Sequence, residues 1–187
     1  LKSKLYLLIL IFFIPLSVFN QTKPNFSLKI LGVVQDGGLP HLGSNKLCCE
    51  NYENRRYVTS IMLINNENNE SYLFDASPDI NEQLNFMGDR INKDLKGIFL
   101  THAHIGHYTG LMFFGREALN SNLINVFAMP RMKKFLETNG PWSQLVKLNN
   151  INLIQIHSES VFSLSDQIRI TPFEVPHRGE FSETVGY

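Results

Sequence analysis

The stretch Thr101-His102-Ala103-His104-Ile105-Gly106-His107 carries the strongest signal in the sequence. Three of the six histidines of the chain fall here, directly after the apolar run 97–100, which is typical of a short buried strand. Side chains alternate along an extended chain, so His102 and His104 point to one side and can reach one metal ion. His107 follows where the chain turns toward a helix. Imidazole suits zinc, and also iron or nickel, so the spacing predicts a metal site; the alternative is a polar loop with solvated histidines.

On both sides of this stretch, apolar and polar residues alternate in runs separated by Asn-rich or Gly-rich turns. Strands are predicted over residues 27–34, 57–64, 71–74, 97–100, 126–129, 152–156, 161–164 and 167–175. Helices are predicted over residues 79–88, 109–119 and 130–136, the last beginning at a proline. Strands first, followed by strands alternating with helices, indicate sheet layers covered by helices.

Residues 101–110 resemble the His-x-His-x-Asp-His motif of the metallo-β-lactamase superfamily. Residues 72–76 are similar to the strand of that family that ends in an Asp, and residues 175–177 to a later strand that supplies another histidine. Together with residues 31–43, the motif more narrowly resembles the branch related to coenzyme PQQ biosynthesis protein B. The resemblance implies the α+β four-layer αββα sandwich of the superfamily. We expect this sandwich to be incomplete at the C-terminus, because the sequence stops inside an apparent strand.

The resemblance also implies roles for individual residues. His102, His104 and His177 would be the ligands of a first metal site, and His107 would belong to a second site. Asp75 would brace the metal-binding loop without touching the metal. The alternative for Asp75 is a residue that caps a turn at the end of its strand.

Gly106 departs from the family motif, which has an Asp at this position. Glycine offers no side chain, so the second site loses an anionic ligand. We therefore expect one zinc ion per chain, with a metal-bound water as the nucleophile and no further catalytic side chain. The rival interpretation is a dinuclear site completed by residues beyond Tyr187.

His41, Cys48 and Cys49 form a second candidate cluster, for a structural metal. Two thiolates and one imidazole make an incomplete tetrahedral set, and Ser44 stands where a further cysteine would be expected. Thiols that bind no metal are the alternative, which the missing ligand favours.

The leading functional hypothesis is a zinc-dependent hydrolase that acts on an ester, amide or phosphodiester of a small molecule. The alternative is a non-hydrolytic metal-binding protein, related to PQQ cofactor biosynthesis or to carriage of a small molecule, and Gly106 slightly favours it. Lys plus Arg and Asp plus Glu each number 17, so the formal net charge is zero. A chain without excess positive charge is a poor candidate for binding nucleic acid.

The N-terminus has the pattern of a secretory signal peptide. Lys2 and Lys4 precede a run of about 15 mostly apolar residues, which is shorter than the roughly 20 residues of a membrane-spanning helix. We expect a signal over residues 1–20, a metallo-β-lactamase-like domain over residues 21–187, and export to the periplasm or cell surface. The alternative is an uncleaved N-terminal anchor, and membrane contact is expected only through this segment.

Overall fold

The computed structural model describes residues 25–50 and 55–187 of the chain, and the predicted signal peptide lies outside them. The strands are β1 (Phe26–Gly32), β2 (Ser60–Asn65), β3 (Ser71–Phe74), β4 (Leu95–Phe99), β5 (Ile124–Ala128), β6 (Ile151–Gln155), β7 (Phe162–Ser163), β8 (Arg169–Ile170), β9 (Phe173–Glu174) and β10 (Val185–Gly186). The helices are α1 (Leu47–Glu50), α2 (Ile80–Leu84), α3 (Ile91–Asp94), α4 (Ile105–Tyr108), α5 (Pro130–Thr138) and α6 (Trp142–Lys147), with 3-10 helices η2 (Asn85–Arg90) and η3 (Thr109–Phe114). No helix of the described ranges is long and apolar enough to cross a membrane.

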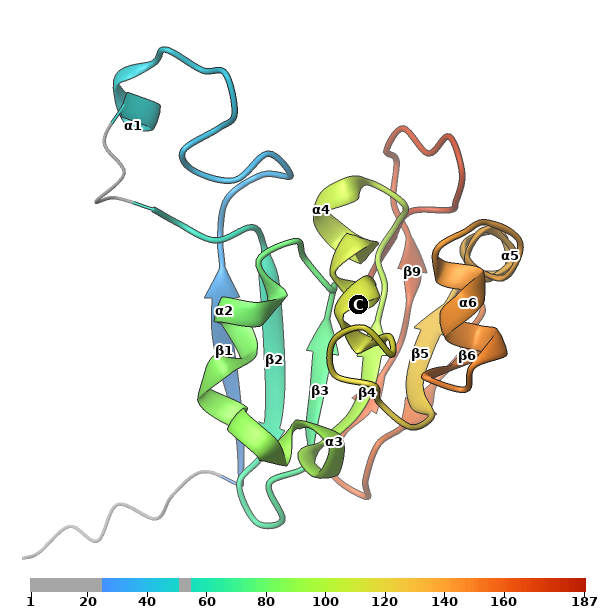
Figure 1. The fold of residues 1–187 in the computed structure, drawn as a ribbon. Coiled ribbons are helices and arrows are strands. Elements are labelled where there is room, and N and C mark those ends of the chain that lie inside the picture. Colours follow the sequence, from blue (N-terminus) through green and yellow to red (C-terminus); the bar gives the residue numbers. More distant parts are fainter. Residues whose placement is uncertain (1–24, 51–54) are drawn as a thin grey trace, which may run out of the picture.

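One mixed sheet of six strands, in the order β1 to β6, organises the molecule (Figure 1). β1, β2 and β3 pair antiparallel, whereas β3, β4, β5 and β6 are parallel neighbours. The carboxyl ends of β3 and β4 therefore meet at the same edge of the sheet, where parallel sheets commonly place their ligand sites.

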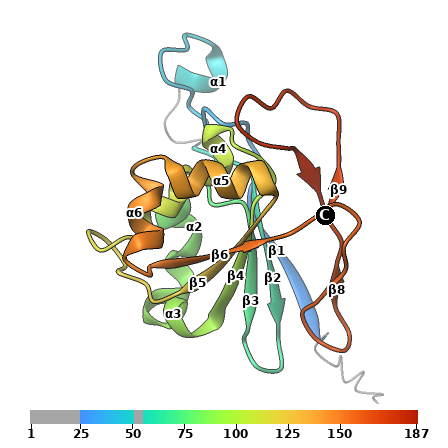
Figure 2. The same ribbon diagram turned by 90° about the vertical axis from the view of Figure 1, so that its right-hand side faces the viewer.

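The helices α2 to α6 cover one face of this sheet, and the segment that carries β7 to β10 lies against the other face (Figure 2). On the helical face, Leu73, Ile98 and Val126 are partners in neighbouring strands and are almost completely buried. Burial of this apolar surface is the main force that holds the helices to the sheet.

The opposite face of the sheet carries aromatic side chains that alternate with the apolar residues of the helical face. Phe99 stacks between Phe74 and Phe127, with ring centroids 5.3 and 4.3 Å away. Tyr187 packs edge-on against Phe99, and its hydroxyl donates a 2.8 Å hydrogen bond to the carbonyl of Leu100. These contacts bring the last described segment back to the end of β4.

The α+β fold expected from the sequence is confirmed. Of the four layers, the described residues form the first helical layer, the six-stranded sheet and two short ladders, β7–β8 and β9–β10, on its second face. The expected strand 71–74 has the observed limits of β3.

Three predicted elements are interrupted in the structure. The helix expected over 79–88 is kinked, because Gly88 adopts φ 55° and ψ −135°. The helix expected over 109–119 ends at Phe114, and the strand expected over 167–175 is divided into β8 and β9. Pro172 lies in that division, where it cannot donate a ladder hydrogen bond.

Candidate metal centre

The loop that follows β4 is fixed to the end of β3 by the backbone and side chain of Asp75. The amide of Asp75 donates to the carbonyl of Phe99, and its buried carboxylate accepts a 2.8 Å hydrogen bond from the amide of Thr101. The hydroxyl of Thr101 lies 2.9 Å from the second carboxylate oxygen. Asp75 has φ 65°, a left-handed conformation that Asp and Asn tolerate better than most residues. The carboxylate therefore sits beneath the histidine loop.

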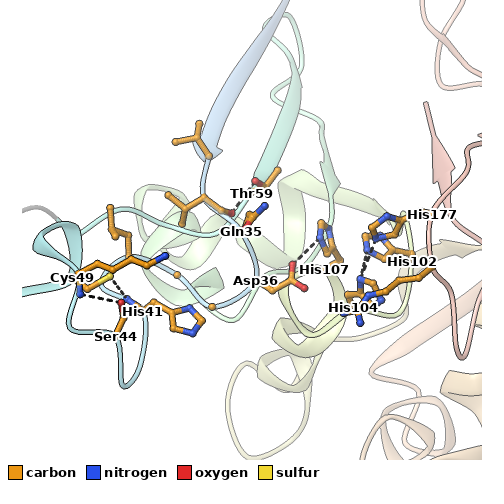
Figure 3. Close-up of a pocket in the computed structure, with 17 residues that line it drawn as sticks. Gln35, Asp36, His41, Ser44, Cys49, Thr59, His102, His104, His107 and His177 are labelled. Carbon is orange, nitrogen blue, oxygen red and sulfur yellow. Dashed lines mark hydrogen bonds and ion pairs between the residues drawn. The ribbon is translucent and has the colours of Figure 1, made fainter.

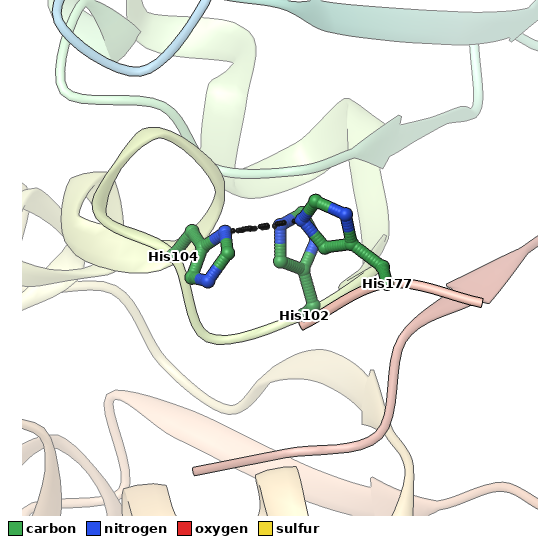
Figure 4. Close-up of side chains that lie close together, drawn as sticks. All are labelled: His102, His104 and His177. Carbon is green, nitrogen blue, oxygen red and sulfur yellow. Dashed lines mark hydrogen bonds between the residues drawn. The ribbon is translucent and has the colours of Figure 1, made fainter. Parts of the chain in front are cut away.

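His102, His104 and His177 converge at this edge of the sheet (Figure 4). One ring nitrogen from each lies within 4.8 Å of the others, although His177 comes from the distant segment after β9. The distance from His104 Nδ1 is 3.0 Å to His102 Nε2 and 3.3 Å to His177 Nε2. Within the described parts of the chain, these three form the one group of three or more His, Cys, Asp or Glu side chains close enough to hold a metal ion together.

The remaining nitrogens of two of these rings have polar partners. His102 Nδ1 lies 2.9 Å from the Thr101 hydroxyl, and His104 Nε2 lies 3.2 Å from Glu180 Oε2. With a proton on each of these partnered nitrogens, the lone pairs of His102 Nε2 and His104 Nδ1 face the common centre. Metal-binding histidines in proteins are oriented in the same way.

The environment keeps His102 neutral. Burial lowers the pKa of His102 to about 3, with help from the nearby rings of His107, His104 and His177. A neutral imidazole is the form that binds metal, and three imidazoles suit zinc. The donor set therefore fits a zinc ion.

His107 lies beside this trio, with its ring centroid 4.1 Å from that of His102, but it faces two carboxylates, of which Figure 3 shows Asp36. Its Nδ1 lies 2.6 Å from Asp75 Oδ2, and its Nε2 lies 3.2 Å from Asp36 Oδ1. Burial alone would lower the pKa of His107. The hydrogen bond to Asp75 and the charges of Asp75 and Asp36 outweigh burial, so the pKa is raised.

Three residues that the sequence did not single out hold the loop. Glu180 contacts His104, Ser182 accepts a 2.8 Å hydrogen bond from the amide of Ala103, and Asp36 reaches His107. Each comes from a segment far from the histidine motif in sequence. Asp36 precedes two glycines in a turn-rich loop, and nothing in that pattern marks it as a site residue.

The structure describes two of the three side chains of the second predicted cluster, so this cluster stays a prediction. The thiol of buried Cys49 accepts a 3.3 Å hydrogen bond from the amide of His41. Among the described side chains, no third His, Cys, Asp or Glu lies close enough to hold a metal ion with these two. The side chain of Cys48 lies outside the described residues.

A pocket of about 960 Å³ opens over the histidines. One wall is the loop from Val33 to Lys46, and the other is formed by the four histidines His102, His104, His107 and His177 (Figure 3) together with Arg178. Asp36 belongs to the first wall and points across to His107. The pocket is large enough for a small-molecule ligand.

A model of the beta-lactamase superfamily domain matches residues 70–187. No curated protein matches the chain. Among solved structures, Zn²⁺-bound PqqB from Methylobacterium extorquens aligns with a TM-score of 0.68 at 20% identity, over 86% of this chain and 57% of that one. A diphosphatase from the PhnP family aligns with a TM-score of 0.65 at 21% identity, over 87% and 61%. MEM-A1, a subclass B3 metallo-beta-lactamase from a soil metagenome library, aligns with a TM-score of 0.50 at 18% identity, over 85% and 53%.

These identities establish a shared fold and nothing finer. The chain spans about 60% of the length of the PqqB and diphosphatase structures.

Proposed function

Since the chain belongs to the beta-lactamase superfamily, we propose that it is a zinc-dependent hydrolase whose tightly held metal is bound by His102, His104 and His177. The convergence of three imidazole nitrogens within 4.8 Å is the observation that carries this proposal. Bound zinc supplies Lewis acidity, which polarises a carbonyl or phosphoryl oxygen and makes water acidic enough to react near neutral pH.

The residues of the chain prepare this centre. Asp75 and Thr101 orient His102, and Glu180 orients His104, so that a nitrogen of each ring faces the metal position. Burial of His102 keeps its ring unprotonated over the working range of most enzymes. No rearrangement of these two side chains is then needed before metal binds.

The proposed substrate is a small molecule with an ester, amide or phosphodiester bond. Lys46 and Arg178 line the pocket, and their positive charges favour a negatively charged substrate. Of the three classes only the phosphodiester always carries such a charge, so it is the first substrate to test. The description of one structural neighbour as a diphosphatase supports the same order of testing.

The test compares zinc content and hydrolysis in the wild type, His104→Ala, His177→Ala and the control His157→Ala, which changes an exposed histidine outside the site. Chromogenic phosphodiester, ester and β-lactam substrates would be used. We expect both site variants to lose zinc and to lose activity on the order of 100-fold, while the control keeps both. Retention of zinc and activity in His177→Ala would contradict the proposed ligand set.

The alternative function is a non-hydrolytic metal-binding protein, related to PQQ biosynthesis or to carriage of a small molecule. Gly106 favours it, because the residue removes the acidic side chain of the family motif. The fold shared with Zn²⁺-bound PqqB is compatible with it. A zinc-loaded protein that hydrolyses none of the three substrate classes would favour this alternative.

Export to the periplasm or cell surface is proposed from the signal-like pattern of residues 1–20, followed by the domain from residue 21. Fusion of residues 1–20 to a reporter that is active only outside the cytoplasm tests it. An inactive reporter would contradict export.

A further inference from the structure

The carboxylate that the histidine motif lacks is supplied in space by another part of the chain. Asp36 belongs to the loop after β1, and its Oδ1 lies 3.2 Å from Nε2 of His107. This nitrogen is the one that faces the pocket, because Asp75 occupies Nδ1 on the other side of the ring. A carboxylate and an imidazole therefore meet at the pocket wall, beside the trio.

Gly106 makes this approach feasible. A β-carbon at position 106 would lie 2.5 Å from Asp36 Oδ1 and 2.8 Å from Asp36 Cα. Both distances are far below van der Waals contact, and the second involves backbone that cannot swing aside. Thus the residue that removes the motif carboxylate also makes the room that Asp36 fills.

We propose that Asp36 replaces the missing carboxylate of the motif, and that Asp36 and His107 together hold a second divalent cation next to the one at His102, His104 and His177. The inference rests on the proposed function for the first metal. The second cation binds more weakly, because only these two side chains of the described residues are assigned to it.

The geometry of the pair suits a shared ion. Two ligands of a tetrahedral zinc ion with bonds of about 2.1 Å are separated by about 3.4 Å, close to the 3.2 Å between Asp36 Oδ1 and His107 Nε2. Asp75 accepts a hydrogen bond from the opposite nitrogen of His107. Such a partner orients a histidine ligand and raises the basicity of the nitrogen that binds the metal.

The charge of Asp36 and its exposure to the pocket also favour a second cation at this position. The three imidazoles of the trio are neutral ligands, whereas Asp36 brings a negative charge to the adjacent position. The Asp36 side chain is 33% exposed and lines the same pocket as His107 and the three histidines of the trio, so an ion from solvent can reach its carboxylate.

The test counts metal ions in the full chain. Metal-free wild type, Asp36→Asn and the matched control Asp166→Asn would be titrated with Zn²⁺ by calorimetry and with Co²⁺ by absorption. Asp166 is an exposed residue between β7 and β8. We expect two equivalents in the wild type and the control. Asp36→Asn should keep the tight equivalent and bind the second at least about tenfold more weakly. One equivalent in the wild type, or an unchanged second equivalent in Asp36→Asn, would overturn the inference.

A double variant that exchanges the residues at positions 36 and 106 tests whether the loss of binding in Asp36→Asn is due to the carboxylate or to a local change in structure. Asp36→Gly combined with Gly106→Asp moves the carboxylate to the motif position and removes the contact with Oδ1, and the conformational freedom of glycine lets the loop backbone move away from the new β-carbon. We expect it to recover the second equivalent, while Gly106→Asp alone does not. Failure of the exchange together with full binding by Asp36→Asn would refute a role for Asp36. Loss of the tightly bound metal ion in His177→Ala tests the proposed function separately. The proposed function and the second cation site can therefore fail independently.

Discussion

Replacement of Asp75 by Asn tests how the histidine loop is held. The buried carboxylate accepts hydrogen bonds from the amide and hydroxyl of Thr101 and from Nδ1 of His107. Asn has the same shape and tolerates φ 65°, so the backbone is expected to stay in place. The amide oxygen can keep the Thr101 contacts, but its NH₂ group then faces the Nδ1–H of His107. Loss of one charge-assisted hydrogen bond in a buried site costs about 1.5–3 kcal/mol.

A second effect of the same substitution is specific to His107. The ring can accept a hydrogen bond from the new amide only if Nδ1 carries no proton, so a neutral ring would keep its proton on Nε2, where it donates to Asp36. We expect Asp75→Asn to lower the free energy of unfolding of the metal-free protein by about 2 kcal/mol in urea titrations. Nitrogen chemical shifts of His107 should report the changed tautomer.

The matched control is Asp94→Asn. Asp94 is similarly buried, but its carboxylate makes a longer ion pair of 3.5 Å with Arg90. Helix α3, which Asp94 ends, lies at the opposite end of the sheet from α4. This substitution should cost less than about 1 kcal/mol. An Asp75→Asn variant that loses no more stability than the control, or that leaves the His107 tautomer unchanged, would refute the reasoning.

Three further outcomes are expected. In the unfolded chain His102 gains a proton below about pH 6.5, whereas the folded ring stays neutral down to about pH 3, so the free energy of unfolding of the metal-free protein falls by about 1.4 kcal/mol for each pH unit within that window. His102→Asn should flatten this part of a pH series of urea unfolding. An unchanged slope would contradict the assignment. Gly110→Ala places a β-carbon 2.1 Å from the carbonyl oxygen of Ser77, so thermal unfolding should show a loss of more than about 2 kcal/mol, and a wild-type melting curve would be inconsistent with this packing. Ser182→Ala leaves the buried amide of Ala103 without its acceptor and should cost about 1–3 kcal/mol in urea, whereas Ser182→Thr, which keeps the hydroxyl, should cost less; equal losses would argue against the hydrogen bond.

The sequence predicted the sheet well because its strands carry short-range patterns. The run 71–74 follows the Asn-rich turn 65–70 and became β3 with the expected limits. The helices were predicted less well, since Gly88 and the segment after Phe114 depart from helical geometry through local conformations that periodicity does not encode. Pro172 marks the break between β8 and β9, because proline cannot donate a ladder hydrogen bond.

The candidate site could be predicted where its residues share one stretch of chain. His102, His104 and His107 stand together in sequence, and the resemblance pointed to His177. Asp36 and Glu180 could not be found in this way, because their roles arise only when separate loops meet at the carboxyl end of β4. A lone acidic residue in a loop is common, and only distance to a partner distinguishes it.

The close approach of Asp36 to Gly106 has a consequence for evolution within this branch. Two positions from separate loops share one small volume, so neither can acquire a larger residue freely while the other is retained. A lineage that regained an acidic side chain at position 106 would have to surrender the one at position 36 or shift its loop, and an intermediate with both would be selected against. The two sites should therefore covary, and a motif read at one of them alone would misjudge the acidity of the centre.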